Sequence, residues 1–196
     1  MEISTQNIAE IKKATTQYPV SELFKTRYSG RSFTSQKLAE TEINTILEAA
    51  SWAPSSMNEQ PWLYRFAENG TEAFNLMLSF LSPGNQIWVK DAPGLILSVG
   101  RKTHLSNGQP NAYYMYDVGA ANALLLLQAH DLGFTTHIMA GFDHPKANQI
   151  FAKEGETQVI CFIAIGKQDS PDKLPEPFKT RETNPRSRKT LSEILF

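Results

Sequence analysis

The sequence predicts an α+β fold, in which helices and strands alternate along the chain without a regular βαβ period. Three observations support this prediction. Apolar residues recur at helical spacing over residues 41–52. Residues 94–100 and 159–165 form short apolar runs, which are typical of buried strands. The chain has 196 residues, of which 41% are hydrophobic and 20% charged, so one folded domain is expected and not a disordered chain.

In the first half of the chain, capping and turn residues divide the expected helices from one strand. Ser21 and Thr41 are placed to cap helices, and Pro54 would end the second of them. Pro83 and Gly84 would end a later helix. The expected helices cover residues 1–20, 21–26, 41–52 and 71–81, and the expected strand covers residues 62–67.

The second half is expected to contain a long central helix between strands. Residues 111–132 are apolar on nearly every face, so this helix must be buried centrally or against a partner chain. Gly133 follows it in the position that often ends a helix. The other expected elements are strands over residues 94–100, 134–139 and 159–165 and a helix over residues 145–153.

The C-terminal segment, residues 167–196, differs in composition from the rest of the chain. Four prolines stand there among charged residues, which predicts an extended arm that has no core of its own. The end of the arm is nevertheless apolar and is expected to pack on another surface, such as a second subunit. The residues concerned are Leu191, Ile194, Leu195 and Phe196.

Several kinds of site are excluded by the composition. Cys161 is the only cysteine, and the four histidines are not spaced as helical ligands, so no metal site is expected. No glycine pattern matches a dinucleotide fingerprint or a P-loop, and no G-x-S-x-G elbow is present. The longest apolar run, residues 159–165, is far shorter than the ~20 residues of a membrane helix. No apolar segment follows Lys12 and Lys13, so a cytoplasmic location without a secretory signal is expected.

The net charge of −1 conceals two basic islands. Residues 25–31 contain three cations and no acid, and residues 179–189 contain five cations and one acid, Glu182. The islands carry +3 and +4, which leaves −8 on the rest of the chain. Two small islands at opposite ends of an acidic chain indicate a local anion site and not a broad nucleic-acid face. Two solvated surface patches remain the alternative.

Two further segments have the chemistry of a binding site. Residues 27–33 place two guanidinium groups and hydroxyl donors around Gly30, where glycine allows a sharp bend. These donors suit a phosphate dianion. Residues 53–62 place short polar side chains and amides in a proline-bounded loop that follows a helix. Such groups can bind a polar heterocycle or a sugar alcohol. A turn that merely contains proline and serine is the alternative.

Both segments resemble motifs of the FMN-dependent nitroreductase family. Residues 27–33, RYSGRSF, are similar to its R-x-S-x-[RK]-x-F opening, and residues 53–62, APSSMNEQPW, to its A-P-S-x-x-N-x-Q-P-W signature. Leu132-Gly133 and Gly141-Phe142-Asp143 resemble its later L-G and G-F-D region, and residues 186–189 resemble its terminal basic motif. The resemblance extends in the expected order from Arg27 to the C-terminus.

The resemblance implies which residues bind FMN. The phosphate and ribityl chain would be held from one end by Arg27, Tyr28, Ser29 and Arg31 and from the other by Arg186 and Arg188, with Asn85 as a further ribityl contact. The isoalloxazine would be bordered, from the partner subunit, by Pro54, Ser55, Ser56 and Asn58, with Gln60 toward the ribityl or pyrimidine region. Flavin N5 and O4 would face the N–H groups of Ala140 and Gly141, beside Met139. Tyr28 and Met139-Ala140 depart from the family's usual residues.

The resemblance also implies an architecture and a reaction. The fold would be nitroreductase-like, with a central mixed or antiparallel sheet flanked by helices, in an intertwined homodimer that shares its active sites and exchanges C-terminal arms. NADH or NADPH would deliver hydride to flavin N5, and a small oxidised acceptor such as a nitroaromatic or a quinone would then take the electrons, in a ping-pong sequence. FMN carries this chemistry, so no catalytic side chain is assigned.

Two alternatives to this function stay open. The first is another reaction on the same fold, such as enoate reduction, dehalogenation or flavin breakdown. The second is a non-catalytic module that binds an anionic partner such as RNA, although no sheet motif that alternates aromatic and basic residues is present. Outside the motifs, Trp62 and Phe142 are expected in the core. His137 is expected to be a hydrogen-bonded strand residue, or to face the flavin, and Glu59 is expected to be solvated or to contact substrate.

Overall fold

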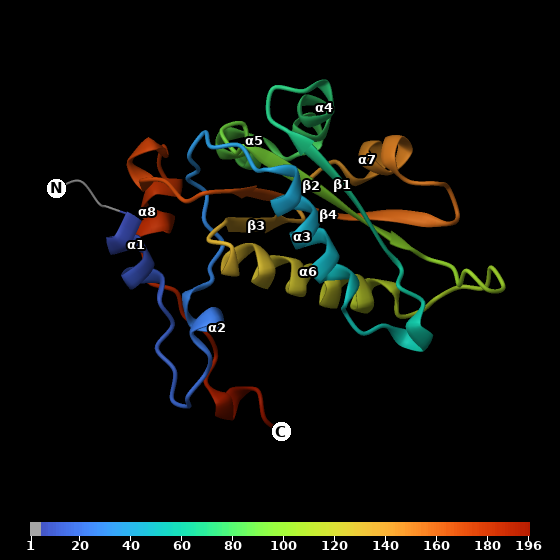
Figure 1. The fold of residues 1–196 in the computed structure, drawn as a ribbon, viewed down its shortest axis with the longest axis horizontal. Coiled ribbons are helices and arrows are strands. Elements are labelled where there is room, and N and C mark those ends of the chain that lie inside the picture. The colour runs from blue at the N-terminus through green and yellow to red at the C-terminus, as the bar shows by residue number, and fades with distance from the viewer. Residues whose placement is uncertain (1–4) are drawn as a thin grey trace.

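The computed structural model describes residues 5–196, which form a four-stranded sheet with helices on both faces (Figure 1). All three strand pairs are antiparallel, so the expected sheet is antiparallel and not mixed. In spatial order the strands are β1 (Trp62–Glu68), β2 (Gly94–Arg101), β4 (Thr157–Gly166) and β3 (Thr135–Met139). The four strands predicted from the sequence are confirmed to within two residues at each end.

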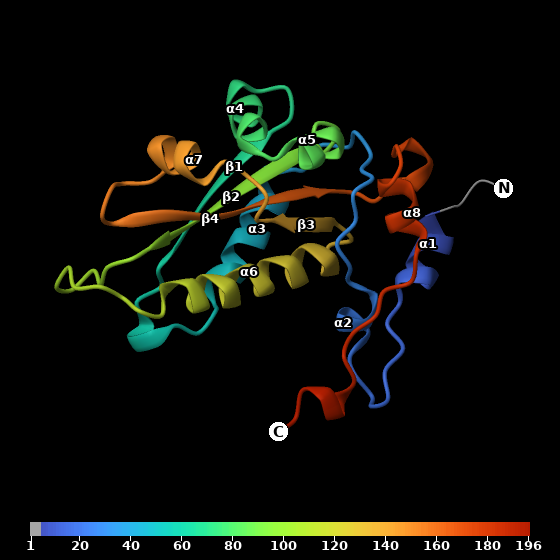
Figure 2. The same ribbon diagram turned by 180° about the vertical axis from the view of Figure 1, so that it is seen from behind.

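Helices cover the sheet in two layers, which Figures 1 and 2 show from opposite sides. Side chains of β2 alternate between the layers, because Leu95 and Leu97 pack in one core cluster and Ile96 packs in the other. Since both sheet faces are covered, β2 is buried over nearly its whole length. One layer consists of α3 (Glu40–Ser51) and α6 (Tyr114–Asp131), and the other of α4 (Glu72–Phe80), α5 (Pro83–Val89) and α7 (His144–Phe151).

The start of α3 corrects one predicted cap. The helix begins at Glu40, so Thr41 lies inside it and not at the cap. Instead, the N–H of Ala39 donates to Glu42 Oε2 at 2.8 Å, which satisfies an N–H group that the helix itself leaves unpaired.

Helix α5 is absent from the sequence-based prediction. Pro83 and Gly84 were expected only to end a helix, and α4 does end at Phe80. Pro83 also starts the next helix, because proline at the first helical position needs no N–H donor and has a helical φ. α5 contributes to the core at its C-terminal end, where Trp88 and Val89 are buried.

The N-terminal region is less helical than expected. α1 (Thr5–Lys12) is followed by a non-helical stretch and then by α2 (Glu22–Thr26), so the helix predicted over residues 1–20 ends at Lys12. Its first four residues lie outside the described residues. The N–H of Ala14 donates to the carbonyl of Lys25 at 2.8 Å, and this contact between the two segments replaces the next helical hydrogen bond.

The C-terminal segment corrects the prediction of an extended arm without a core. It contains α8 (Phe178–Thr183) and two short 3₁₀ segments, η2 (Pro171–Lys173) and η3 (Leu191–Glu193). Leu174 and Phe178 belong to the main core, and α8 packs against α1. The chain beyond α8 extends away from the sheet (Figure 1), and the apolar residues at its end are exposed in this chain, so their expected packing on another surface stays a prediction.

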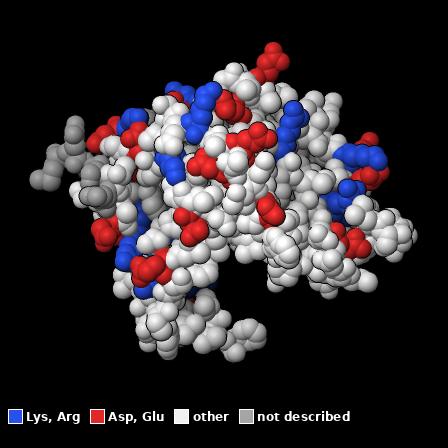
Figure 3. Space-filling view, in the orientation of Figure 1, with Lys and Arg blue, Asp and Glu red and all other residues white. Residues whose placement is uncertain are grey.

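Helix α6 is buried on one face and exposed on the other, so it is not buried centrally within this chain, and the expected alternative of burial against a partner chain stays a prediction. Val118, Asn122 and Leu125 pack toward the sheet, whereas the buried Asp117 contacts the loop of residues 53–60. Tyr116 is 79% exposed. In Figure 3 the molecule is hollowed beneath this region, beside the C-terminal segment. No helix in the described part of the chain is long and apolar enough to cross a membrane.

Candidate functional site

The loop of residues 27–31, which carries the first basic island, is fixed by three other elements. His137 Nδ1 on β3 donates to the carbonyl of Gly30 at 3.2 Å. The N–H of Arg31 donates to Glu182 Oε1 on α8 at 3.1 Å. Arg186 Nη1, beyond α8, donates to the carbonyl of Arg27 at 2.6 Å. The backbone of this loop is therefore held in place by β3 and by the C-terminal segment.

Gly30 is required by close packing and not by a sharp bend. Its backbone is not in the left-handed region. A Cβ there would overlap Gln168 Oε1 and would lie 2.6 Å from Thr135 Cγ2. Only glycine lets the loop approach β3 and the start of the C-terminal segment so closely.

Four cations from three segments surround a cavity of about 170 Å³, which we call the cation cavity. Two of these lining residues have a buried side-chain nitrogen, Arg27 Nη1 and Arg186 Nε, with no hydrogen-bond partner among residues 5–196. Burial lowers the pKa of Arg27, and the charges of Arg186 and Arg188 lower it further. Buried donors without acceptors fit an anion, such as a phosphate group, that would satisfy them. The lining residues are Lys12, Arg27, Tyr28, Ser29, Arg186 and Arg188.

The cation cavity unites the two basic islands, but one predicted member lies elsewhere. The guanidinium of Arg31 does not line the cavity. It lies 3.6 Å from Glu182 Oε2 and 5.9 Å from the ring centre of Trp88. Arg186 also donates to backbone carbonyls, so it both braces the loop and lines the cavity. The role of Arg31 in cofactor binding stays a prediction.

The loop of residues 53–60 has a strained backbone. Met57, Asn58 and Gln60 adopt left-handed φ values of 53°, 58° and 49°, although none of them is glycine. Such positions cost of order 1–3 kcal/mol each and are concentrated at functional sites. Two hydrogen bonds hold the loop, because Ser55 Oγ accepts from the N–H of Gln60 at 3.0 Å and Asp117 Oδ2 accepts from the N–H of Ser56 at 3.1 Å.

Replacing Ser55 with alanine is expected to lower the free energy of unfolding by about 1 kcal/mol, because the hydrogen bond that closes the strained loop is lost. Urea titration followed by tryptophan fluorescence measures this change. Ser79→Ala, which removes a similarly local side-chain hydrogen bond at an exposed position of α4, is the control for a hydroxyl outside the loop. If both variants lose the same stability, Ser55 has no special role in holding the loop.

Glu59 was expected to be solvated or to contact substrate, but its side chain is only 12% exposed. Its carboxylate accepts from the N–H of Leu105 at 3.0 Å, and its second oxygen lies 3.2 Å from His104 Nδ1. The Leu105 N–H and the neighbouring His104 keep the pKa of Glu59 below its ordinary value. Glu59 therefore joins the strained loop to the excursion that connects β2 with α6.

The predicted segment 139–141 meets Asn85. Asn85 Nδ2 donates to the carbonyl of Gly141 at 3.1 Å, and the N–H of Ser82 donates to the same carbonyl at 2.9 Å. The side chain of Met139 is buried in the core, whereas Ala140 and Gly141 are exposed. The backbone of these two residues is therefore accessible to a ligand.

Within one chain, not all predicted site residues come together. η1 (Ser56–Asn58) lies at the N-terminal end of α6, and the loop of residues 27–31 lies toward the other end (Figures 1 and 2). The set of Pro54, Ser55, Ser56, Asn58 and Gln60 is thus separate from the cation cavity. Their separation agrees with the implied contribution from a partner subunit, which stays a prediction.

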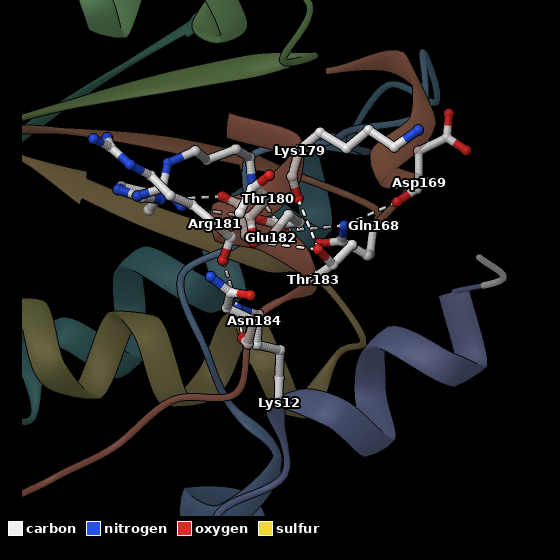
Figure 4. A network of polar contacts seen from close by, with 12 residues as sticks. Lys12, Gln168, Asp169, Lys179, Thr180, Arg181, Glu182, Thr183 and Asn184 are labelled. Atoms are coloured by element: carbon white, nitrogen blue, oxygen red, sulfur yellow. Dashed lines mark hydrogen bonds and ion pairs between the residues drawn. The ribbon is translucent and has the colours of Figure 1, made fainter. Parts of the chain in front are cut away.

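Several residues that hold the site were not singled out from the sequence. Lys12 lines the cation cavity from α1, and Glu182 is fully buried beside the loop of residues 27–31 (Figure 4). Burial raises the pKa of Glu182, and the Arg31 N–H and the charges of Arg31 and Lys12 oppose the rise. One available signal was that Glu182 is the only acid in the second basic island. No group of His, Cys, Asp and Glu within residues 5–196 is arranged to hold a metal ion.

The sequence of this chain matches a known family model. The model described as "Nitroreductase family" matches residues 24–73 and 63–167, which is most of the chain. The chain belongs to the nitroreductase family. Both motifs identified in the sequence, residues 27–33 and residues 53–62, lie inside the matched residues.

Solved and curated relatives agree with this membership of the nitroreductase family. A crystal structure described as an oxidoreductase containing FMN is 32% identical and superposes with a TM-score of 0.86, with 93% of each chain covered. A nitroreductase family protein from Streptococcus pneumoniae shares the fold, with 21% identity, a TM-score of 0.72 and coverage of 89% of this chain and 98% of that one. An oxygen-insensitive NADPH nitroreductase of Helicobacter pylori is 24% identical over 75% of this chain and 86% of its own.

Proposed function

We propose that this member of the nitroreductase family is an FMN-dependent oxidoreductase that transfers electrons from NADH or NADPH to a small oxidised acceptor, such as a nitroaromatic or a quinone. The observation that supports this most is the cation cavity with its two unpartnered buried donors. The similarity to a solved oxidoreductase containing FMN, at 32% identity, supports the choice of cofactor. A ping-pong sequence and a cytoplasmic location belong to the same proposal.

The residues present fit the phosphate end of FMN. A phosphate dianion in the cation cavity would accept hydrogen bonds from Arg27 Nη1 and Arg186 Nε, which otherwise lack acceptors. The cavity of about 170 Å³ is smaller than the ~300 Å³ at which pockets for whole ligands begin, so it suits the phosphate and not the entire nucleotide. The ribityl chain and the ring would then lie along the surface toward Asn85 and Gly141.

The chain's own residues would bind and orient the cofactor and would not exchange protons with the substrate. Arg27, Ser29 and Arg188 would hold the phosphate, while the N–H groups of Ala140 and Gly141 would face the ring edge. When bound, FMN supplies the position that accepts and returns hydride, and the protons that accompany reduction of the acceptor would come from solvent, so no acid or base is assigned to the protein. The partner's loop of residues 53–60 would cover the ring.

A homodimer belongs to this proposal, and the surface of α6 supports it. The exposed face of α6 has no Lys or Arg, and Tyr113, Met115 and Tyr116 are each at least 55% exposed. Exposed aromatic and Met side chains without charges are typical of the centre of an interface. Trp52 and Met57, 80% and 86% exposed, extend this surface to the strained loop.

Replacing Gly119 with glutamate is expected to convert the dimer into monomers. Apart from the adjacent backbone of α6, a Cβ at Gly119 meets no atom of residues 5–196 within 4 Å, so the larger side chain fits the monomer but places a charge in the proposed interface. Sedimentation equilibrium measures the change. Ile150→Glu, at an exposed apolar position on α7, is the control and should leave the mass unchanged. A wild-type protein that sediments as a monomer contradicts the dimer.

The test of the proposed function is spectroscopic. Purified protein supplied with FMN should show flavin absorbance that NADH or NADPH bleaches without oxygen, and a nitroaromatic or quinone should restore it. A protein that binds no FMN contradicts the proposal. Bleaching only by a chemical reductant favours the same-fold reactions that do not use a nicotinamide donor.

A further inference from the structure

Helix α1 lies outside the part of the chain that matches the family model, and its last residue reaches the cation cavity. The match begins at residue 24, whereas Lys12 ends α1. Lys12 is 8% exposed and lines the cavity beside Arg27 and Arg186. Figure 4 shows its side chain running from α1 to the chain at the end of α8.

Two backbone carbonyls fix the Lys12 ammonium group. Lys12 Nζ donates to the carbonyl of Arg181 at 2.8 Å and to that of Asn184 at 2.6 Å. An ammonium group has three N–H donors, so one remains after these two bonds. Because the side chain is held at its tip and lines the cavity, the remaining donor is available to an anion there.

The charges around Lys12 also favour an anion. Burial lowers the pKa of Lys12, and Arg31 and Arg186 lower it further, while Glu182 opposes them. Glu182 is already engaged by the N–H and the guanidinium of Arg31. Lys12, Arg27, Arg186 and Arg188 therefore form a group of four cations around one small cavity. An anion in the cavity would offset their mutual repulsion.

We propose that Lys12 binds the phosphate group of FMN, so that α1 is part of the cofactor site of this chain. The inference rests on the proposed function. The inference assigns a binding role to a helix that lies before the family match. The contact between α1 and α8 would position the Lys12 ammonium group at the phosphate.

Lys12→Gln and Lys12→Met test this inference through binding. Both variants remove the charge, and Gln keeps an N–H donor for a carbonyl of α8. The dissociation constant for FMN is expected to rise about tenfold, the size of one lost hydrogen bond to a charged group, while that for riboflavin stays nearly constant. Lys12→Arg keeps the charge and should retain the preference for FMN. Lys13→Gln is the matched control, because Lys13 is exposed and pairs with Glu22 at 3.0 Å.

The same variants have a second readout in thermal unfolding of the flavin-free protein. Inorganic phosphate should raise the melting temperature of the wild type and of Lys13→Gln, and raise it less in Lys12→Gln. Equal losses of FMN and riboflavin affinity, with an unchanged effect of phosphate, would show that Lys12 only braces α8 and would overturn the inference.

Failure of this inference is distinguishable from failure of the proposed function. If the wild type binds FMN more tightly than riboflavin and the Lys12 variants keep that ratio, the inference alone is wrong. If the wild type binds neither flavin, the proposed function is wrong as well.

Discussion

Replacing Arg27 with alanine is expected to weaken FMN binding by roughly 1.5–3 kcal/mol and to leave riboflavin binding nearly unchanged. Arg27 lines the cation cavity and its buried Nη1 has no partner in the described part of the chain, so a phosphate oxygen would be its acceptor. Riboflavin has no phosphate and cannot make this contact. Arg188→Ala should have an effect of the same kind, because its guanidinium lines the same cavity. Calorimetric titration of the flavin-free protein with each flavin measures both constants.

The control for this experiment is Arg65→Ala. This substitution removes a guanidinium group from β1. The group lies 6.0 Å from the ring centre of Phe151 and not at the cation cavity. The control should bind both flavins as the wild type does. Equal losses of FMN and riboflavin affinity in Arg27→Ala would mean that Arg27 stabilises the loop of residues 27–31 and does not bind phosphate.

The strands and the long helices could be predicted from the sequence because their signals are local. β2 and β4 are continuous apolar runs between turn residues, and α3 has apolar residues at helical spacing. α5 could not be predicted in this way, since Pro83-Gly84 is a common stop signal that here also begins a helix. The fold class required only the local signals, whereas the path of the C-terminal segment depends on contacts with distant residues.

The binding site could be predicted only as far as its motifs extend. The resemblance identified Arg27 and Arg188, which the structure places on one cavity. It could not identify Lys12, whose partners Arg181 and Asn184 are 169 and 172 residues away in the chain. Nor does any glycine mark the left-handed positions of the strained loop. Its backbone N–H groups donate to Ser55 Oγ and Asp117 Oδ2, and these hydrogen bonds hold a backbone conformation that the local sequence disfavours.

The second large effect concerns His137, which supports the loop of residues 27–31 from β3. Its Nδ1 donates to the carbonyl of Gly30, and its ring centre lies 4.7 Å from that of Trp88. These contacts confirm the expected hydrogen-bonded strand histidine. Burial lowers the pKa of His137 from 6.5 to about 4, and the charge of Arg31 acts in the same direction. The imidazole is therefore neutral in the folded protein near neutral pH.

This lowered pKa makes the fold less stable in acid. Above pH 6.5 the imidazole is neutral in both states, and its full contribution to stability is present. As the pH falls from 6.5 to about 4, the unfolded chain takes up a proton that the folded chain does not, so unfolding becomes more favourable. The expected loss by pH 4 is about 3 kcal/mol, from a shift of some 2.5 pKa units.

His137→Phe and His137→Gln isolate this contribution. Phe keeps a ring against Trp88, and Gln keeps an N–H donor for the carbonyl of Gly30, but neither side chain takes up a proton in this range. Urea unfolding from pH 7 to pH 4 should show a smaller decrease in stability in both variants than in the wild type. The raised pKa of Glu182 acts in the opposite direction in all three proteins, so the difference between wild type and variant reports on His137. A wild type and variants that lose stability in parallel would mean that the histidine is accessible to protons, and that the support beneath the phosphate loop is looser than its burial indicates.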